Sequence, residues 1–317
     1  MRPAGFQAIL ILLAVACAGA PALAQQPSAT EQAVRLALAG RCAEALPLLK
    51  QAVAQARDKD TKRLTGKFGV RCAMLLNRQS VAATFLAGLQ EEFPDDPDIL
   101  FLAVHMYSDL AYRNSQRLMQ VAPDSDEVLR LNAENFEKAG DAKRAIGEYR
   151  VLLQRHPGIP GIHYRIGGLI LESTGAGTSE EARQEFEDEL KIDPTSAGAH
   201  YYLGELARQD DKAADAIEQY AAAVKLSPDF AEAEFGLGRS LLDMGKTAES
   251  VEPLEKAAHL APDNPTIHFA LATAYQRMGR KEDAAREFAL QKSAADKLNA
   301  NTKALHKNIA GADGSAK

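Results

Sequence analysis

Apolar residues recur along most of this chain at the intervals of three and four residues that are typical of amphipathic helices. The segment 200–228, HYYLGELARQDDKAADAIEQYAAAVKLSP, contains two such runs with one polar break between them. It therefore predicts two helices joined by a tight turn. The same scheme returns in the segment 234–262, and we find no run with the period-two alternation of strands. The expected fold class is all-α.

Prolines mark a repeat of this helix pair. Pro194, Pro228 and Pro262 are spaced by 34 residues, which is also the spacing of Pro123 and Pro157. We number each unit so that this proline is position 32. Position 15 then holds residues that tolerate the left-handed conformation in which a first helix can end: Gly40, Gly140, Asp211, Gly245 and Gly279.

Small and large residues also recur in the second helix of the units. Position 20 is alanine, which lets two antiparallel helices approach closely, in six units: Ala45, Ala82, Ala145, Ala182, Ala216 and Ala284. Position 24 lies one helical turn later and holds a large side chain: Leu49, Tyr149, Phe186, Tyr220 or Phe288. One helix pair cannot bury its own apolar face, whereas stacked pairs can. The pattern predicts a solenoid.

The repeat resembles the tetratricopeptide repeat, whose signature contains Leu-Gly, then Ala-x3-Phe, then Pro. HYYLGELA at 200–207 supplies Leu-Gly, AIEQY at 216–220 supplies the alanine and an aromatic residue, and Pro228 closes the unit. The resemblance implies a right-handed superhelical solenoid of about eight stacked helix-turn-helix repeats with a C-terminal capping helix. The units begin near Gln26, Arg63, Pro97, Asp126, Pro160, Ala197, Ala231 and Pro265.

Two units depart from the regular length. The unit at Pro97 is five residues shorter than the regular 34. The unit at Pro160 is three residues longer than 34, and the extra residues lie in the small-residue segment STGAGTSEE. The expected organisation is a signal peptide at 1–24, divergent repeat-like units at 25–125, a regular array at 126–298, and the end of the capping helix with a tail at 299–317. The closing helix is expected from Lys281 to about residue 308.

The N-terminal segment has the pattern of a secretory signal peptide. Arg2 gives a basic start, residues 8–18 are apolar, and Ala22-Leu23-Ala24 forms a small-x-small cleavage site. An alternative interpretation makes Cys17 the lipid-modified residue of a lipoprotein, although Ala14 stands where a lipobox usually has Leu. The expected location is outside the cytoplasm, periplasmic or secreted, and we expect no membrane span after the signal.

The charge of the chain narrows the class of partner. The chain has 37 basic and 43 acidic residues, a net charge of −6, and no cluster of basic residues that would bind nucleic acid.

Two cysteines, Cys42 and Cys72, remain after cleavage of the signal peptide. An even cysteine count in an exported protein suggests a disulfide between them, while two buried free thiols are the alternative.

Motifs of catalysis and metal binding are missing from the sequence. It contains no His-Glu-x-x-His, Gly-x-Ser-x-Gly, Gly-x4-Gly-Lys or Cys-x2-Cys. His163, His200 and His268 share position 4 of their units with Glu234, and such a set could bind a metal ion. Position 4 is the Trp place of the repeat family, so the resemblance favours packing residues. We expect no metal, no cofactor and no enzymatic activity.

The resemblance also points to a binding face. Positions 2, 5, 9, 12 and 13 of each first helix line the concave groove of tetratricopeptide solenoids. Position 5 holds Phe101, Tyr164, Tyr201, Phe235 and Phe269, and the other positions include Glu205, Arg208, Arg239, Gln276 and Arg277. Such an aromatic stripe with mixed charges suits a peptide or amphipathic helix. The alternative is that the aromatic rings only fill the space between adjacent first helices.

These observations predict an exported, non-enzymatic scaffold that binds a protein or peptide partner in its concave groove, within envelope assembly or secretion. Two alternatives remain. One is a lipid-anchored envelope assembly factor modified at Cys17. The other is the regulatory part of an enzyme, which would need an acid–base cluster such as Glu205 with His163 or His200. Self-association of the chain is also open.

Overall fold

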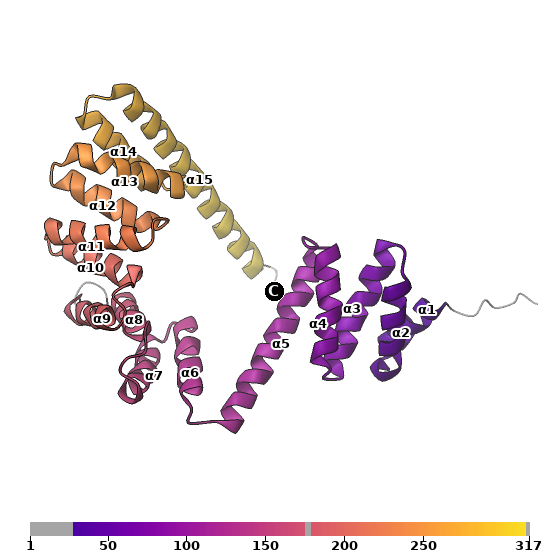
Figure 1. The fold of residues 1–317 in the computed structure, drawn as a ribbon. Coiled ribbons are helices and arrows are strands. Elements are labelled where there is room, and N and C mark those ends of the chain that lie inside the picture. The colour runs from indigo at the N-terminus through magenta and orange to yellow at the C-terminus, as the bar shows by residue number, and fades with distance from the viewer. Residues whose placement is uncertain (1–27, 175–178, 315–317) are drawn as a thin grey trace, which may run out of the picture. The chain divides into compact units, whose positions relative to one another are not determined.

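The computed structural model describes residues 28–174 and 179–314, and all regular elements in these ranges are α-helices (Figure 1). This confirms the all-α prediction. The predicted signal peptide and Cys17 lie outside the described residues. The helices divide into two compact units, one ending at Arg117 and the other beginning at Leu118. Among the described residues, no helix is both long and apolar enough to cross a membrane.

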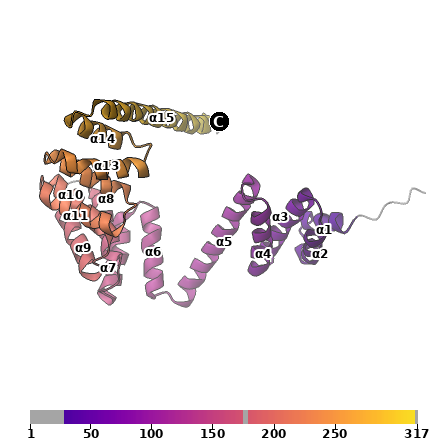
Figure 2. The ribbon, with the colours of Figure 1, turned by 45° about the horizontal axis from the view of Figure 1, so that its top comes forward.

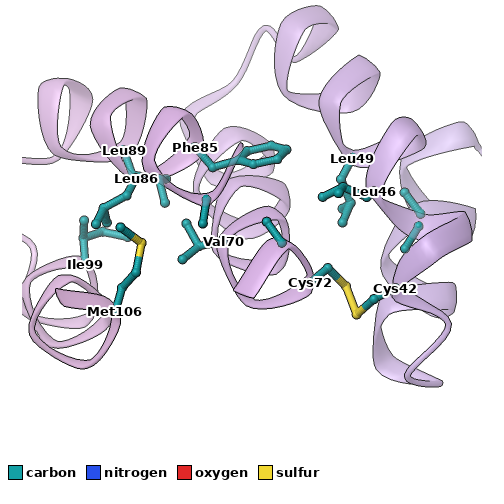
Figure 3. Packing of buried hydrophobic residues seen from close by; sticks show 14 of the residues in the cluster. Cys42, Leu46, Leu49, Val70, Cys72, Phe85, Leu86, Leu89, Ile99 and Met106 are labelled. Atoms are coloured by element: carbon teal, nitrogen blue, oxygen red, sulfur yellow. A yellow bond between two sulfur atoms is a disulfide. The ribbon is translucent and has the colours of Figure 1, made fainter. Parts of the chain in front are cut away.

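The N-terminal unit is built from two helix pairs followed by one long helix. Its elements are α1 (Ala29–Leu38), α2 (Cys42–Gln55), α3 (Lys59–Leu75), α4 (Gln79–Glu92) and α5 (Pro97–Val121), whose last turn belongs to the next unit. Figure 3 shows Leu46 and Leu49 of α2 and Leu86 of α4 in its core, with Ile99 of α5. These side chains are at most 1% exposed, so this unit has its own apolar core.

One prediction is wrong within this unit. The short unit at Pro97 was expected to form a helix pair, but α5 is a single helix of 25 residues. Position 15 of this unit is Ala111, where other units have Gly or Asp. Alanine is the best helix former and does not favour the left-handed conformation that ends a first helix. The helix therefore continues through the position where a turn was expected.

The C-terminal unit contains five consecutive helix pairs in its described residues (Figures 1 and 2). They are α6 (Asp126–Lys138) with α7 (Ala142–Arg155), α8 (Ile162–Thr174) with α9 (Ser179–Ile192), α10 (Ala197–Gln209) with α11 (Ala213–Leu226), α12 (Ala231–Asp243) with α13 (Thr247–Leu260), and α14 (Pro265–Arg277) with α15 (Lys281–Gly314). Each helix packs against the next in the chain. The solenoid prediction is confirmed. The closing helix α15 extends about six residues beyond its predicted end.

Left-handed residues end the first helices as the sequence predicted. Gly40, Gly140, Gly245 and Gly279 have φ between 73° and 77°, and Asp211 has φ 60°. The sequence analysis missed Asn77, which has φ 56° at position 15 of the unit that begins at Arg63. Asparagine is one of the few residues besides glycine that adopt this conformation readily. Six of the seven units that form a helix pair therefore have a left-handed residue at position 15. The seventh begins at Pro160 and has Thr174 of α8 at that position, and the segment 175–178 that follows lies outside the described residues.

The small and large residues of each helix pair interlock. Ala145, Ala182 and Ala216 at position 20 are fully buried. A Cβ atom added to Gly204 of α10 would lie 2.8 Å from the Tyr220 ring of α11. One added to Gly167 of α8 would lie 2.8 Å from the Phe186 ring of α9. Each ring therefore occupies the space that the glycine leaves empty.

The two cysteines of the N-terminal unit are joined by a disulfide in this structure (Figure 3). Cys42 begins α2 and Cys72 lies near the end of α3, with their Cα atoms 4.9 Å apart. Both side chains are buried in the core of the unit. The bond ties the first helix pair to the second.

Candidate functional site

The first helices of the C-terminal unit carry most of the predicted groove residues. Tyr164 lies on α8, Tyr201 on α10, Phe235 on α12 and Phe269 on α14, and each is the fifth residue of its unit. Contacts of α10 with α12 and of α12 with α14 show that alternate helices adjoin one another. Equivalent positions therefore follow one another along this side of the unit, which we call the first-helix face.

A pocket of about 310 Å³ opens on this face between α6, α8 and α10. Tyr164, Arg165 and Glu172 of α8 line it, together with Glu137 of α6 and Tyr202 of α10. The Nη1 atom of Arg165 donates a hydrogen bond of 2.8 Å to Glu137 Oε2. The pocket thus combines two aromatic rings, one ion pair and a second carboxylate, so it can contact apolar groups and charges of both signs.

The Tyr164 ring both lines this pocket and packs against its neighbours. Its centroid lies 5.8 Å from that of Tyr202 and 6.1 Å from that of Phe186. A Cβ atom added to Gly198 would lie 2.6 Å from Tyr164 Cε2, so the ring rests directly on the start of α10. Burial raises the pKa of the Tyr164 hydroxyl. Removing this side chain would affect packing as well as binding.

Tyr201 is also half-buried among aromatic residues. Its ring centroid lies 4.9 Å from that of Phe230 and 6.0 Å from that of Tyr220. Burial raises the pKa of Tyr201 to about 12, with a smaller contribution from the Glu205 carboxylate. The phenol therefore stays protonated at neutral pH and can donate a hydrogen bond.

Glu205 and Arg208 are held in place by each other and by a buried tyrosine. Arg208 Nη2 donates to Glu205 Oε2 at 2.8 Å, and the Tyr220 hydroxyl donates to Glu205 Oε1. Burial, and then the bond to Glu205, raise the pKa of Tyr220. The Glu205 and Arg208 side chains keep 25% and 31% of their surface exposed. They present a pre-ordered pair of charges on the first-helix face.

The remaining predicted residues of this unit are more exposed. Phe269 is 54% exposed, and its ring meets that of Phe288 edge-on with centroids 6.2 Å apart. Arg239 is 47% exposed and pairs at 4.0 Å with Asp243. Phe235 is half-buried beside the core of α12–α15. Substitution of Phe269 or Arg239 should therefore disturb the packing of the helices less than substitution of the buried rings.

Gln276 and Arg277 at the end of α14 are exposed, but they have different surroundings. The Nη1 atom of Arg277 donates a 2.8 Å hydrogen bond to the Leu242 carbonyl oxygen at the end of α12. It thereby caps the neighbouring first helix. To bind a ligand in the predicted groove, the Arg277 guanidinium would have to share or give up this hydrogen bond.

Models of a known protein family match a large part of the C-terminal unit. Two models described as tetratricopeptide repeat match the sequence, one at residues 175–231 and 201–265 and the other at residues 241–309. Together these matches span residues 175–309. Among curated proteins, none matches this chain.

Solved structures of MamA proteins resemble the chain in fold. One described as the crystal structure of MamA shares 23% sequence identity, with a TM-score of 0.47 over 53% of this chain and 96% of that one. MamA 41-end from Desulfovibrio magneticus RS-1 shares 20% identity, with a TM-score of 0.49 over 55% and 97% of the two chains.

Phe101 belongs to the other compact unit, where it lies on α5. It is 67% exposed, and its ring contacts the His105 imidazole with centroids 4.2 Å apart. The tetratricopeptide numbering gave it position 5, as for Tyr164 and Tyr201. However, α5 does not form the helix pair to which that numbering refers, so the numbering does not assign Phe101 to the first-helix face.

The position-4 histidines bond within their own tetratricopeptide repeats. His163 Nδ1 lies 2.6 Å from Glu185 Oε2, His200 Nδ1 lies 2.8 Å from Gln219 Oε1, and His268 Nδ1 lies 2.7 Å from Glu287 Oε2. Each partner is on the second helix of the same pair. Within 28–174 and 179–314, no three His, Cys, Asp or Glu residues are grouped so that they could bind a metal ion.

Three charged or aromatic residues of the pocket between α6, α8 and α10 were missed by the sequence analysis. Glu172 occupies position 13 of the tetratricopeptide unit at Pro160, so the numbering already contained the signal that would have found it. Arg165 and Tyr202 occupy position 6, which is not among the groove positions of the family. They line the pocket all the same, so the family's groove positions did not contain a signal for them.

Proposed function

We propose that the protein is a non-enzymatic tetratricopeptide scaffold whose first-helix face binds an extended peptide segment of a protein partner. The observation that carries this proposal is the pocket between α6, α8 and α10. Tyr164 and Glu172 stand at groove positions of the repeat in this pocket, which offers the rings of Tyr164 and Tyr202 beside the Arg165–Glu137 ion pair. Aromatic rings supply apolar contact area, and placed charges select the register of a peptide.

Rigid packing supports binding on this face. Tyr164 rests on Gly198, and Glu205 is held by two hydrogen bonds. Side chains that are already ordered lose little conformational entropy when a ligand binds. The packing of these rings, which was the alternative to a binding role, thus contributes to binding by fixing the shape of the face.

The surroundings of the polar residues favour binding over acid–base catalysis. Glu205 accepts hydrogen bonds from Tyr220 and Arg208, whereas His163 and His200 bond to Glu185 and Gln219. The acid–base cluster required by the enzyme alternative is not assembled from these residues. We therefore retain the scaffold as the proposed function.

Export from the cytoplasm forms part of the proposal. It is supported by the signal-peptide pattern of residues 1–24 and by the disulfide between Cys42 and Cys72, a bond that persists in oxidising compartments. The proposed setting is envelope assembly or secretion. The mass of the mature N-terminus distinguishes a chain that begins at Gln25 from a lipoprotein that begins at a modified Cys17.

Selection of peptides from a displayed random library tests the binding function. Residues 25–317 would serve as bait, and the affinities of the selected peptides would be measured by calorimetry. We expect Glu172→Lys, which reverses a charge of the pocket, and Arg239→Glu, at an exposed groove position of α12, each to weaken binding by about tenfold.

Lys225→Glu on the second helix α11 is the matched control, because Lys225 is exposed and lies outside the first-helix face. It should leave the affinity unchanged. Peptides that bind both groove variants as tightly as the original protein would contradict the proposed site.

A further inference from the structure

A larger pocket lies in the N-terminal unit, between α2, α3 and α4. Its volume is about 600 Å³, within the range of small-molecule sites. Val53, Val81, Phe85 and Leu89 line it with apolar groups. Figure 3 shows the Phe85 ring extending from α4 towards the α2 side chains. Neither the repeat pattern nor the predicted groove positions pointed to this place.

Small residues along α4 keep the pocket open. Ser80, Thr84 and Gly88 are spaced by four residues, so they lie on one side of the helix and all line the pocket. A Cβ atom added to Gly88 would meet no other atom within 4 Å. From Ser80 to Glu92 the lining follows about 18 Å of helix, given a rise of 1.5 Å per residue. The pocket is therefore elongated along α4.

Three charged side chains line this pocket: Lys50, Lys62 and Glu92. Lys62 Nζ lies 3.2 Å from Glu92 Oε2, so these two charges offset each other. Lys50 on α2 forms no hydrogen bond or ion pair with any of the described residues. An elongated apolar pocket with one unpaired ammonium group is complementary to a ligand with an apolar body and a single anionic head.

We propose that this pocket binds an amphipathic carboxylate of the fatty-acid class. The aliphatic tail lies along α4 over Phe85 and Leu89, and the carboxylate pairs with the Lys50 ammonium group. This site is separate from the peptide-binding face of the C-terminal unit, and the two proposals stand or fail independently.

Titration of decanoate into residues 25–317 tests the apolar part of the pocket. With methyl groups labelled for NMR, saturable shifts are expected at Val53, Val81 and Leu89. Gly88→Leu fills the open space beside α4 and should weaken decanoate binding by about tenfold or more, because the tail can no longer occupy it.

The control for this variant is Gly147→Leu. Gly147 is also an exposed helical glycine with no atom within 4 Å of an added Cβ, but it lies on α7 in the other unit. It should bind decanoate as the original protein does. Equal binding by both leucine variants, or shifts confined to other methyl groups, would overturn the proposal, as would the lack of saturable shifts.

The head group is tested with Lys50→Gln and with decanol, which has the same chain without a charge. We expect the variant to bind decanoate about tenfold more weakly, a loss of about 1.4 kcal/mol, because its neutral amide cannot form an ion pair with the carboxylate. Its affinity for decanol should be unchanged. Unaltered decanoate binding by Lys50→Gln would show that the carboxylate is not recognised as proposed.

Discussion

The two compact units solve the same packing problem with different contacts. In the C-terminal unit, glycine at position 8 of a first helix faces a large residue at position 24 of the second, as Gly204 faces Tyr220 and Gly238 faces Leu254. In the N-terminal unit, Gly69 at position 7 faces Phe85 at position 23. The interlock is kept, but it is displaced by one residue on both helices.

A second difference lies in what supplements the apolar core. The N-terminal unit has a disulfide between its helix pairs and an ion pair between Arg63 and Asp96, whose Nε and Oδ2 atoms are 2.7 Å apart. The C-terminal unit also has ion pairs between repeats, such as Arg165–Glu137, but it contains no cysteine and stacks five helix pairs, so each inner pair is covered on both sides. A short array has fewer neighbouring repeats to stabilise it. The comparison indicates that the divergent unit depends on its cross-link and the regular unit on repeated contacts.

The largest effect is expected from Tyr220→Ala in the regular unit. The Tyr220 ring is fully buried between Gly204 of α10 and Gly236 of α12, so its removal leaves a cavity between two repeats. Loss of a buried aromatic side chain lowers the free energy of unfolding by about 3–5 kcal/mol. Urea unfolding measures the change. Tyr112→Ala, at a position that is 65% exposed, is the control and should have little effect.

Removal of the disulfide should have the next largest effect, confined to the other unit. The bond closes a separation of 30 residues, and the double variant Cys42→Ser with Cys72→Ser is expected to lose about 2–4 kcal/mol. Hydrogen exchange resolved by segment should show faster exchange in α1–α4. Unchanged exchange in those helices would mean that the unit does not depend on its cross-link.

Enlarging the position-20 alanine should destabilise both units to a similar, smaller extent. Ala82 on α4 and Ala216 on α11 are both fully buried. Ala82→Leu and Ala216→Leu overfill a close helix contact, which costs about 1–3 kcal/mol. Chemical denaturation of each variant is the measurement. A neutral result for Ala82→Leu alone would show that the displaced interlock also relaxes position 20.

The smallest effect on stability is expected from substitution of Glu234, and this effect changes with pH. This position-4 carboxyl is buried, Oε1 accepts no hydrogen bond, and Lys256 Nζ lies 3.8 Å away. Burial raises the pKa of Glu234, which Lys256 opposes and Glu252 supports. The contribution of Glu234 to stability is therefore present below its unfolded pKa and is lost as pH rises through its folded pKa.

Glu234→Gln removes this dependence because the amide does not ionise. The melting temperature of the variant relative to the original should increase between about pH 4 and pH 8. Glu232→Gln, an exposed neighbour on α12, is the control and should show no such trend. A difference that stays constant with pH would mean that Glu234 keeps the same charge in the folded and unfolded protein over this range.

The sequence predicted the regular unit better than the divergent one for a physical reason. In the regular unit, Gly140, Asp211 and Gly245 mark turns through local backbone geometry, which depends on residue type and does not require knowledge of the packing partner. At Ala111 the same numbering predicted a turn that helix propensity overrides. Local signals therefore located helices and turns, and they failed where the marker residue was missing.

The candidate site could be predicted only in part. Position numbering located Tyr164, Tyr201 and Phe269 on first helices, but it could not separate packed rings from exposed ones. That distinction depends on neighbours such as Gly198 and Phe230, which contact the rings from other helices. The pocket of the N-terminal unit likewise depends on how three helices pack against one another. No sequence pattern within a single helix could therefore predict it.

The central claim is that the first-helix face of the C-terminal unit binds an extended peptide. The most direct test places a photo-cross-linking phenylalanine analogue at Phe269 on α14 or, for comparison, at Leu226 on α11, both of which are exposed. A peptide selected by display is then irradiated with each protein. We predict that it becomes linked from position 269 and not from position 226. Linkage from position 226 alone, or equally from both, would contradict the account.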